Sequence, residues 1–410
     1  MKYAFQTLLR FITPFGAALF AIAAPASAQM WIASAPGQWH DPANWSPQVV
    51  PNAVGAEAFL ASTAAGGSIS GGGSMSFSAP ITLGHLSVDM GFGGPLFFMN
   101  LGTLTLDNGG GADVTIFTTA TGVLGISGQI VLMGNLVTDW RADNGQISAD
   151  ISGEYDVIID SPQAHRRIRL AGVNTYTGDT VVRSGRLGFN SLQNLGDPSG
   201  AIIVEGDGTL ILENLSEPVI SGASFTLMDG GRIWTRAATW DDTITMVGAG
   251  EIAPLFDGFE ALVSGQLTGD GTFIRGSAQS FFTTDPTIES ILNVTNTTND
   301  YTGGTIIRAG VLRIPGDEAL GAAGTPITFQ QAPGLSEGPG ALVTTDDSTI
   351  ARDIVMLSNG WLRAEPGTTG VYTGEISGAR ALSIGFLDWT GAVELRGANL
   401  FTGGVSVQTG

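Results

Sequence analysis

The sequence lacks cysteine altogether and is poor in histidine and lysine. Without cysteine, no disulfide bond stabilises the chain, so its stability must come from burial and hydrogen bonding. With His40, His85 and His165 as the only histidines, it contains neither a His/Cys metal cluster nor an HExxH motif. A nucleophile elbow, a Walker loop and a dinucleotide-binding fingerprint are also missing. We therefore expect no metal, no cofactor and no catalytic residue.

Positive charge is scarce. Lys and Arg together number 17 against 37 Asp and Glu, which gives a formal net charge of −20, and Lys2 is the only lysine. Because nucleic acids and anionic lipid surfaces attract basic proteins, this charge balance argues against both as partners. The simplest interpretation of the acidity is that it keeps an extended surface soluble.

Helical patterns are absent as well. No stretch combines a 3.6-residue apolar period with helix caps, and 60 glycines are too many for a helical protein. A mean hydropathy of +0.23 with 13% charged residues is too apolar for a disordered stalk. The sequence instead has many short apolar runs separated by glycine, such as residues 81–83, 86–88 and 103–106. This composition predicts an all-β fold.

The first 28 residues are typical of a secretory signal peptide. Lys2 and Arg10 supply a positively charged start before an apolar run at 11–24, and Ala26-Ser-Ala28 supplies the small residues that precede a cleavage site. The alternative is a membrane anchor, but the run is shorter than the about 18 residues that a spanning helix needs. We expect cleavage after residue 28 and export of a chain that begins at Gln29.

Residues 29–60 are rich in tryptophan and proline, and we interpret them as an N-terminal aromatic cap. A stack of strands needs a cap because its first turn exposes unpaired strand edges and a bare core. The alternative is that Trp31, Trp39 and Trp45 form a platform on which sugars stack. Residues 61–78 are a Gly, Ser and Ala tract, which predicts a flexible loop.

A repeated segment organises the rest of the chain, which we interpret as one solenoid over residues 61–410. Its copies lie near residues 170–189, 294–314 and 395–410, and the last copy stops before its second strand. The equivalent aromatic residues are 301 − 176 = 125 and 401 − 301 = 100 residues apart, so each interval holds several turns of about 20 to 25 residues. The candidate structural residues of the repeat are Tyr176, Thr177, Gly178, Gly185, Tyr301, Thr302, Gly303, Gly304, Gly310, Phe401, Thr402, Gly403 and Gly404.

The copies predict their own local structure. Gly178, Gly303 and Gly403 precede a strand, and we expect a turn with positive φ at each of them. Apolar and polar residues then alternate, which predicts a strand with one buried face. After Gly185 and Gly310 the alternation shifts by one residue, which predicts a β-bulge or a corner.

The pattern Asn-x-Tyr-Thr-Gly-Gly-Thr, followed by two β-branched residues and then by a small residue, Gly, x and Leu, resembles the autotransporter-associated β-strand repeat of bacterial surface proteins. The match is best around Tyr176 and Tyr301, whereas the third copy has Phe401 and Val405 at the Tyr and Thr positions. The resemblance implies a right-handed parallel β-helix (β-solenoid) that serves as the passenger region of a bacterial autotransporter. It also implies an outer-membrane β-barrel translocator beyond residue 410 of a full-length form.

Two kinds of charged cluster are candidates for chemistry. Asp241-Asp242 and Asp346-Asp347 occupy similar places in their repeats, where they could cleave glycans or bind calcium, although aspartate at the start of a turn explains them more simply. Residues 165–169, His-Arg-Arg-Ile-Arg, could bind an acidic sugar. On an acidic chain, we expect them to pair with neighbouring carboxylates instead.

Three classes of function follow. The resemblance favours a non-catalytic, exported protein at the bacterial cell surface or outside the cell that contributes to adhesion, aggregation or biofilm. Its partner would be an unknown host, cell-surface or glycan ligand. The alternatives are a glycan-active β-helix enzyme, either a polysaccharide lyase or a hydrolase, and a purely structural stalk.

Overall fold

Each strand pairs mainly with strands one turn before it and one turn after it, and nearly all of these pairs are parallel. In the computed structural model, Val181 of β13 (Thr180–Phe189) pairs with Ile203 of β14 (Ala201–Leu212), which pairs in turn with Thr226 of β16 (Ser224–Met228). These partners are 203 − 181 = 22 and 226 − 203 = 23 residues apart, as the repeats predict. The chain is therefore an all-β parallel β-solenoid, which confirms the predicted fold class.

The structure describes residues 28–33, 37–61, 73–89, 97–118, 124–141, 145–161, 167–214, 216, 218–256, 258–276, 289–331, 339–385 and 389–408. The predicted signal peptide, except for Ala28, lies outside these ranges, as do His165, Arg166 and Gly410. The described ranges contain no α-helix, only short 3₁₀ helices: η1 (Pro42–Asn44), η2 (Leu192–Leu195) and η3 (Asp317–Leu320). None of the helices found there has the length and apolar character to cross a membrane.

Within the described ranges the strands form three sheets, of 24, nine and three strands. The largest sheet begins with β1 (Gln29–Trp31), β2 (Trp45–Ser46), β3 (Glu57–Ala61), β4 (Gly73–Ser76), β5 (Ile81–Leu83), β6 (His85–Asp89), β7 (Phe97–Thr118), β8 (Leu124–Trp140), β9 (Gly145–Ile147), β10 (Asp150–Gly153), β11 (Val157–Asp160), β12 (Arg167–Leu170), β13, β14 and β16. It continues with β17 (Arg232–Thr235), β19 (Ile244–Val247), β20 (Ala249–Pro254), β22 (Leu267–Gly269), β23 (Thr272–Arg275), β25 (Thr305–Ile307), β27 (Ile327–Phe329), β30 (Ile354–Met356) and β33 (Ile376–Gly378).

The two smaller sheets cover the C-terminal half. The nine-stranded sheet contains β15 (Val219–Ile220), β18 (Thr239–Trp240), β21 (Glu260–Val263), β24 (Ile291–Val294), β26 (Val311–Ile314), β28 (Gly340–Thr344), β31 (Gly360–Ala364), β34 (Leu382–Ile384) and β36 (Val405–Val407). The three-stranded sheet contains β29 (Ser348–Ile350), β32 (Thr369–Tyr372) and β35 (Ala392–Leu395).

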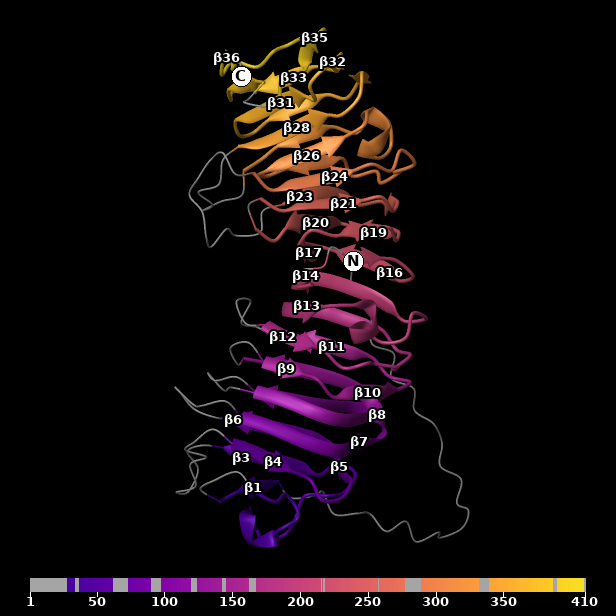
Figure 1. Ribbon diagram of the computed structural model, residues 1–410, viewed down its shortest axis with the longest axis vertical. Coiled ribbons are helices and arrows are strands. Elements are labelled where there is room, and N and C mark those ends of the chain that lie inside the picture. The colour runs from indigo at the N-terminus through magenta and orange to yellow at the C-terminus, as the bar shows by residue number, and fades with distance from the viewer. Residues whose placement is uncertain are drawn as a thin grey trace, which may run out of the picture.

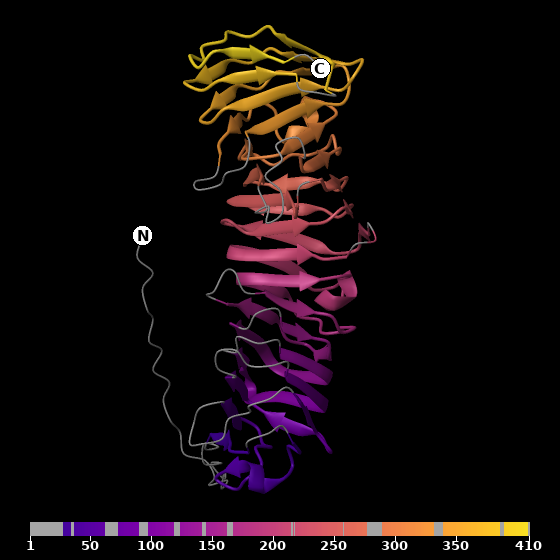
Figure 2. The same cartoon turned by 60° about the vertical axis from the view of Figure 1, so that its left-hand side comes forward.

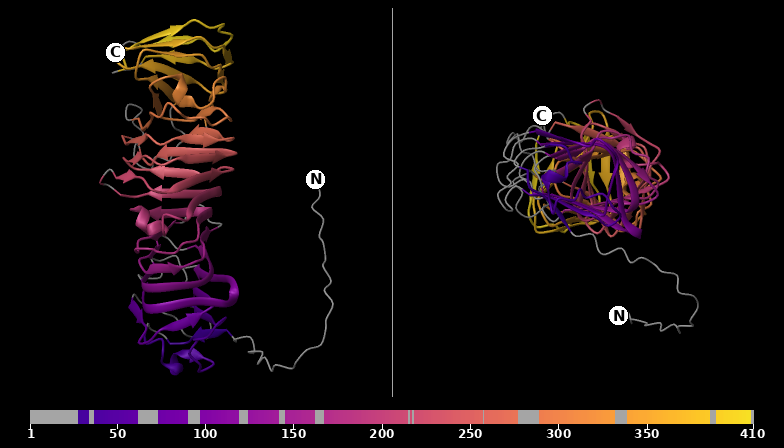
Figure 3. Two further views of the ribbon diagram at one scale, coloured as in Figure 1. Left: turned by 90° about the vertical axis from the view of Figure 1, so that its right-hand side faces the viewer. Right: turned by 90° about the horizontal axis from the view of Figure 1, so that it is seen from below.

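The turns stack along one axis to form a rod. The strands follow one another in sequence order from β1 at one end to β35 and β36 at the other (Figure 1). The same order is visible after the molecule is turned about its long axis (Figure 2). Seen along that axis, the coils superpose around a common interior (Figure 3). Because the rod is one turn thick, its core is a narrow column and its lateral surface is long.

Side chains that point inward form ladders through successive turns. Ile202 pairs with Phe225, Phe225 with Ile244, and Ile244 with Leu267, and all four side chains are buried. The residues that alternate with them, such as Thr226 and Thr245, are only partly buried. This is the two-residue period of a strand with one buried face. Each turn therefore shields its neighbours from water.

A tryptophan cluster occupies the N-terminal end of the rod. Trp31 and Trp45 are in edge-to-face contact with ring centroids 5.2 Å apart, and Trp39 lies 4.6 Å from Trp45. The Trp45 indole N–H donates to the carbonyl oxygen of Trp39 at 2.8 Å. All three side chains are fully buried, which leaves no ring face for a sugar and argues against the platform alternative. The limits of the cap, residues 29–60, stay a prediction.

The expectation of a flexible loop at residues 61–78 is wrong for the end of that segment. Gly73–Ser76 forms β4, which pairs in parallel with β7, and Met75 is fully buried. Phe77 packs against Trp39 with centroids 4.8 Å apart. Within the tract, Met75, Ser76 and Phe77 alternate between apolar and polar residues, which is the pattern of a strand. Residues 62–72 lie outside the described ranges.

Candidate functional site

Tyr176 is the centre of the first repeat. Its ring is fully buried, and its hydroxyl lies 2.5 Å from Thr180 Oγ1. Thr180 Oγ1 donates its own proton to the carbonyl oxygen of Leu195 at 2.7 Å, so the tyrosine hydroxyl donates to Thr180. This chain of hydrogen bonds satisfies a buried phenol and joins the start of β13 to η2.

Asn174 connects the repeat to the turns on both sides. Its side-chain oxygen accepts the backbone N–H of Ile151 at 2.9 Å, and its side-chain amide donates to the carbonyl oxygen of Asn194. Asn194 in turn donates to the carbonyl oxygen of Gly172 at 3.0 Å. Because both asparagines are buried, losing either would leave backbone groups without partners, at a cost of about 1–3 kcal/mol each.

The second repeat, 125 residues later (301 − 176), reproduces this unit. Tyr301 is fully buried with its hydroxyl 2.6 Å from Thr305 Oγ1. Asn299 accepts the backbone N–H of Leu267 at 2.7 Å and donates to the carbonyl oxygen of Ala319 at 2.8 Å. The same residue types thus make the same contacts to the turn before and the turn after.

The third repeat keeps the backbone part of the unit and lacks the hydroxyl pair. Phe401 is only partly buried, and Val405, which stands in the place of Thr180 and Thr305, is 51% exposed. Thr402 nevertheless donates its N–H to the carbonyl oxygen of Gly378 at 2.9 Å. The equivalent bonds run from Thr177 to Gly153 at 2.9 Å and from Thr302 to Gly269 at 3.1 Å.

The glycines Gly178, Gly303 and Gly403 are required by close approach and not by backbone angle. None of them has positive φ, so that part of the prediction is wrong. A Cβ at Gly303 would lie 2.5 Å from the backbone carbon of Gly271, and one at Gly403 would lie 2.1 Å from that of Arg380. The preceding turn therefore lies against these glycines with no room for a side chain.

Positive φ occurs at the glycines that follow. Gly304 and Gly404 have φ of 82° and 85°, and Gly185 and Gly310 have φ of 78° and 62°. The pairing of β13 with β14 shifts register between Val182 and Ser184, which confirms the predicted bulge. At Gly310 the chain turns a corner instead, from β25 in the large sheet to β26 in the nine-stranded sheet.

Sequence reasoning missed the glycines that cover the tyrosine rings. Gly196 has φ of 95°, and a Cβ there would lie 2.6 Å from a ring carbon of Tyr176. Gly321 has φ of 79°, and its Cβ would lie 2.9 Å from the ring of Tyr301. Both follow a leucine in a recurring Leu-Gly pair, so the signal was present in the sequence, but it did not reveal the partner ring.

Three of the four paired aspartates accept hydrogen bonds from neighbouring turns. Asp242 accepts the N–H groups of Gly222 and Ala223 at 2.7 and 3.1 Å, and Asp241 accepts the hydroxyl of Ser264 at 2.9 Å. Asp347 accepts the N–H of Thr369 at 2.7 Å. These contacts favour the turn interpretation over catalysis.

Similar hydrogen bonds, from backbone N–H groups to side-chain oxygens, link successive turns of the rod. Asn135 accepts the N–H of Asp156, Asp156 accepts that of Asp179, and Asp179 accepts that of Ala201, at 3.2, 2.8 and 2.8 Å. Some of the carboxylates of the chain therefore hold successive turns together, in addition to keeping its surface soluble.

The basic cluster pairs with a carboxylate, as expected for its described members. Arg167 and Arg169 both form ion pairs with Glu213, whose side chain is 5% exposed. Two further arginines also form ion pairs, Arg308 with Glu251 and Arg363 with Glu289, both at 2.7 Å. Arg167 and Arg169 are thus engaged with the chain's own acidic group.

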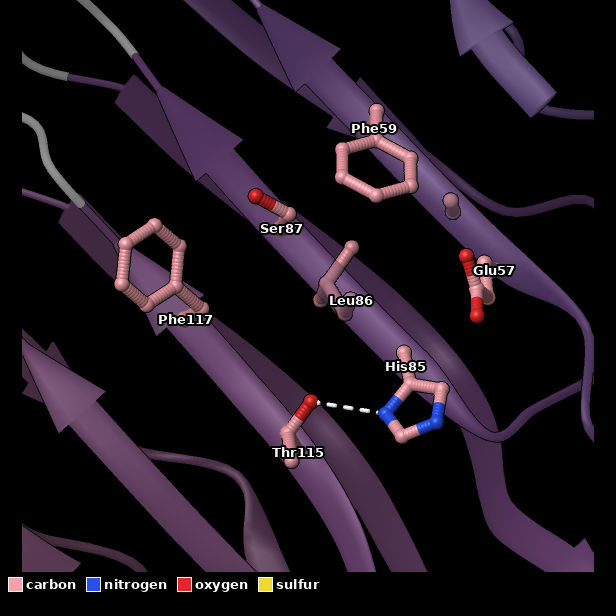
Figure 4. A pocket seen from close by; sticks show the side chains of 8 residues that line it. Glu57, Phe59, His85, Leu86, Ser87, Thr115 and Phe117 are labelled. Atoms are coloured by element: carbon pink, nitrogen blue, oxygen red, sulfur yellow. Dashed lines mark hydrogen bonds between the residues drawn. The ribbon is translucent and has the colours of Figure 1, made fainter. Parts of the chain in front are cut away.

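A shallow cavity of about 260 Å³ lies on the outer face of β3, β6 and β7 (Figure 4). Its lining residues are Glu57, Ala58, Phe59, His85, Leu86, Ser87, Thr115 and Phe117. His85 Nδ1 lies 2.9 Å from Thr115 Oγ1. Sequence reasoning did not identify this surface, because its residues come from turns about 30 residues apart and share no motif.

The described ranges contain no group of three or more His, Asp or Glu side chains placed to hold a metal ion.

We predict that Gly303→Ala lowers thermal stability. The added methyl group would clash with the backbone of Gly271 and Thr272, and overpacking of this kind costs about 1–3 kcal/mol. The measurements are the thermal unfolding midpoint and the rate of limited proteolysis. Gly37→Ala is the matched control, because its Cβ would meet its nearest neighbour at 3.7 Å. Equal midpoints for the two variants would refute the close-approach role.

We also predict that the buried tyrosines make the fold sensitive to alkali. Burial raises the pKa of Tyr176 and Tyr301 above the ordinary value of 10.0. A raised folded-state pKa gives a stability term that is fully present below about pH 10 and lost as the pH rises through the folded-state value.

The double variant Tyr176→Phe and Tyr301→Phe should therefore lose less stability than the wild type between pH 9 and pH 12. At pH 7 it should be slightly less stable, by about 0.5–1.5 kcal/mol for each lost hydrogen bond. Urea unfolding followed by circular dichroism across this range measures both effects. Tyr155→Phe, which alters a partly buried tyrosine outside the repeats, serves as control. A wild-type pH profile in the double variant would contradict the assignment.

Comparison with known proteins agrees with this geometry. The family model described as "Passenger-associated-transport-repeat" matches residues 168–188 and 290–314, which contain most of the first repeat and all of the second. Over 80 residues, 20% of the chain, the sequence is 39% identical to "Adhesin BmaC autotransporter" of Brucella suis biovar 1 (strain 1330). The match spans only 2% of that protein's length.

No solved structure matches the chain significantly. The two matched segments carry the hydrogen-bonded units around Tyr176 and Tyr301. The chain is thus a parallel β-solenoid with two segments that match the passenger-associated transport repeat, and part of it is similar to an autotransporter adhesin.

Proposed function

We propose that the chain is an exported, non-catalytic passenger that contributes to adhesion, aggregation or biofilm at the bacterial surface or outside the cell. The observation that carries this proposal is the incorporation of both matched repeats into one continuous solenoid, together with the similarity to an adhesin. In a longer form of the protein, an outer-membrane β-barrel would translocate and anchor the chain.

The shape of the molecule supports an adhesive role. A rod that is one turn thick presents most of its outward-facing residues to possible partners, and repeated turns can offer several contact points along its length. Several weak contacts made at once give stronger attachment than any single contact. The absence of cysteine also means that no disulfide forms before the chain crosses a membrane.

The enzyme alternative would need carboxylates that converge on a groove with a free arginine. Asp241, Asp242 and Asp347 instead accept hydrogen bonds from the chain itself, and Arg167 and Arg169 are paired with Glu213. These contacts favour the non-catalytic function. The stalk alternative differs only in that the rod itself would bind nothing.

Surface display tests the proposal. Residues 29–408 would be fused to an unrelated β-barrel translocator and produced in a bacterium that adheres poorly. We expect attachment to epithelial cells or to abiotic surfaces to rise severalfold over bacteria that display the barrel alone. An unrelated β-solenoid of similar length on the same barrel is the matched control for a passive stalk.

Attachment no greater than that of the control solenoid would support the stalk and contradict adhesion. Release of unsaturated or reducing sugars from acidic polysaccharides by the purified chain would support the enzyme instead.

A further inference from the structure

The cavity on β3, β6 and β7 is built from two rows of side chains that the strand register sets side by side. Phe59 pairs with Ser87 and Ser87 with Phe117, which makes one row of two aromatic rings on either side of a small residue. Glu57 pairs with His85 and His85 with Thr115, which makes a second row of polar groups. Figure 4 shows both rows on the same side of the strands.

The spacing of these rows matches a ring-shaped ligand. Residues two apart on a strand are about 6.6 Å apart, and successive strands are about 4.8 Å apart, so the backbones at Phe59 and Phe117 lie about 9.6 Å from each other. Ser87 leaves the space between them open. The volume of about 260 Å³ is just below the range of about 300–1,000 Å³ that is typical of pockets for drug-sized molecules. One sugar ring fits this size.

The aromatic row is accessible to a ligand and is held in place. Phe59 is 36% exposed, and Phe117 is partly buried. The guanidinium of Arg141 lies over the Phe117 ring, 5.1 Å from its centroid, and is itself paired with Asp139 at 2.7 Å. Asp139 lies on the next turn, where it pairs with Phe117. The Arg141 and Asp139 pair therefore contacts Phe117 from the side opposite to Ser87.

The polar row has unused hydrogen-bonding capacity. The bond between His85 Nδ1 and Thr115 Oγ1 fixes the imidazole and leaves Nε2 available, whichever tautomer is present. Among the described residues, Glu57 is partly buried and its carboxylate makes no hydrogen bond or ion pair. A carboxylate in this position accepts hydrogen bonds from a ligand that donates them, such as a hydroxyl group.

We propose that this cavity binds a neutral pyranose ring of a glycan. One C–H-rich face of the sugar packs on Phe59 or Phe117, and its hydroxyl groups hydrogen-bond to Glu57 and to Nε2 of His85. The combination of aromatic faces with a few placed polar groups suits a sugar, because a pyranose has an apolar face and a polar rim. An acidic sugar is disfavoured, since the unpaired charge in the cavity is the Glu57 carboxylate.

The inference refines the proposed adhesive function and rests on it only for its biological setting. Binding of the purified, full chain to immobilised neutral oligosaccharides of glucose, galactose and mannose tests the cavity directly, with uronate oligosaccharides included for comparison. Titration calorimetry on the best neutral oligosaccharide then gives the affinity. We expect Phe59→Ala and Phe117→Ala each to weaken binding about threefold to tenfold, and Glu57→Gln to weaken it as well.

Val219→Ala is the matched control, because Val219 is 62% exposed on β15, far along the chain from the cavity. Circular dichroism and the thermal midpoint show whether each variant is folded. Binding of no neutral oligosaccharide, a preference for uronates, or wild-type affinity in both phenylalanine variants would overturn the proposal. If purified chain binds no sugar while displayed chain still promotes attachment, the cavity assignment fails and adhesion stands.

Discussion

The rest of the structure depends on the close backbone contact between successive turns. A parallel solenoid of this kind gains its hydrogen bonds only when each turn lies at the strand spacing of about 4.8 Å from the next. At Gly178, Gly303 and Gly403 the neighbouring backbone lies so close that a Cβ would overlap it. Approach of this kind also occurs outside the repeats, as at Gly134 and Gly265, but in the first two repeats buried asparagines and tyrosines lie beside it and fix the register.

Several charged side chains also hold successive turns together. Asp156 and Asp179 each accept a backbone N–H from the following turn, and Glu213 joins arginines of an earlier one. Arg352 is 2% exposed and donates to the carbonyl oxygen of Gly321 at 2.7 Å, next to the ring of Tyr301. Acidic composition alone suggested a soluble surface, but several of these groups hold turns together.

Local pattern predicts the repeated elements of this fold well. Alternation after Gly178 and Gly303 gives the strands, and the shift at Gly185 gives the bulge, because both follow from short-range geometry. Contacts between turns are harder to predict, since a residue meets a partner 20 to 30 positions away whose register depends on every inserted residue. For this reason the sequence did not reveal that Gly196 and Gly321 cover the tyrosines.

The outer surface is the least predictable part, for the same reason. Phe59, Ser87 and Phe117 share no motif and become neighbours only through pairing of β3, β6 and β7. The tryptophans at the N-terminus were recognisable as a group, but burial decided between a cap and a sugar platform. Composition suggests which residues could bind a partner, whereas the register of the turns decides which of them stand together.

Backbone hydrogen exchange in wild-type chain and in Asn299→Ala tests most directly whether the repeats hold adjacent turns in register. The N–H of Leu267 donates to the Asn299 side chain, and the N–H of Ala322 donates to the carbonyl oxygen of Tyr301. If the repeat holds adjacent turns in register, both amides lose protection together, while Ile151 and Asp197 at the first repeat keep theirs. Loss confined to Leu267, or equal loss throughout the chain, would contradict that claim.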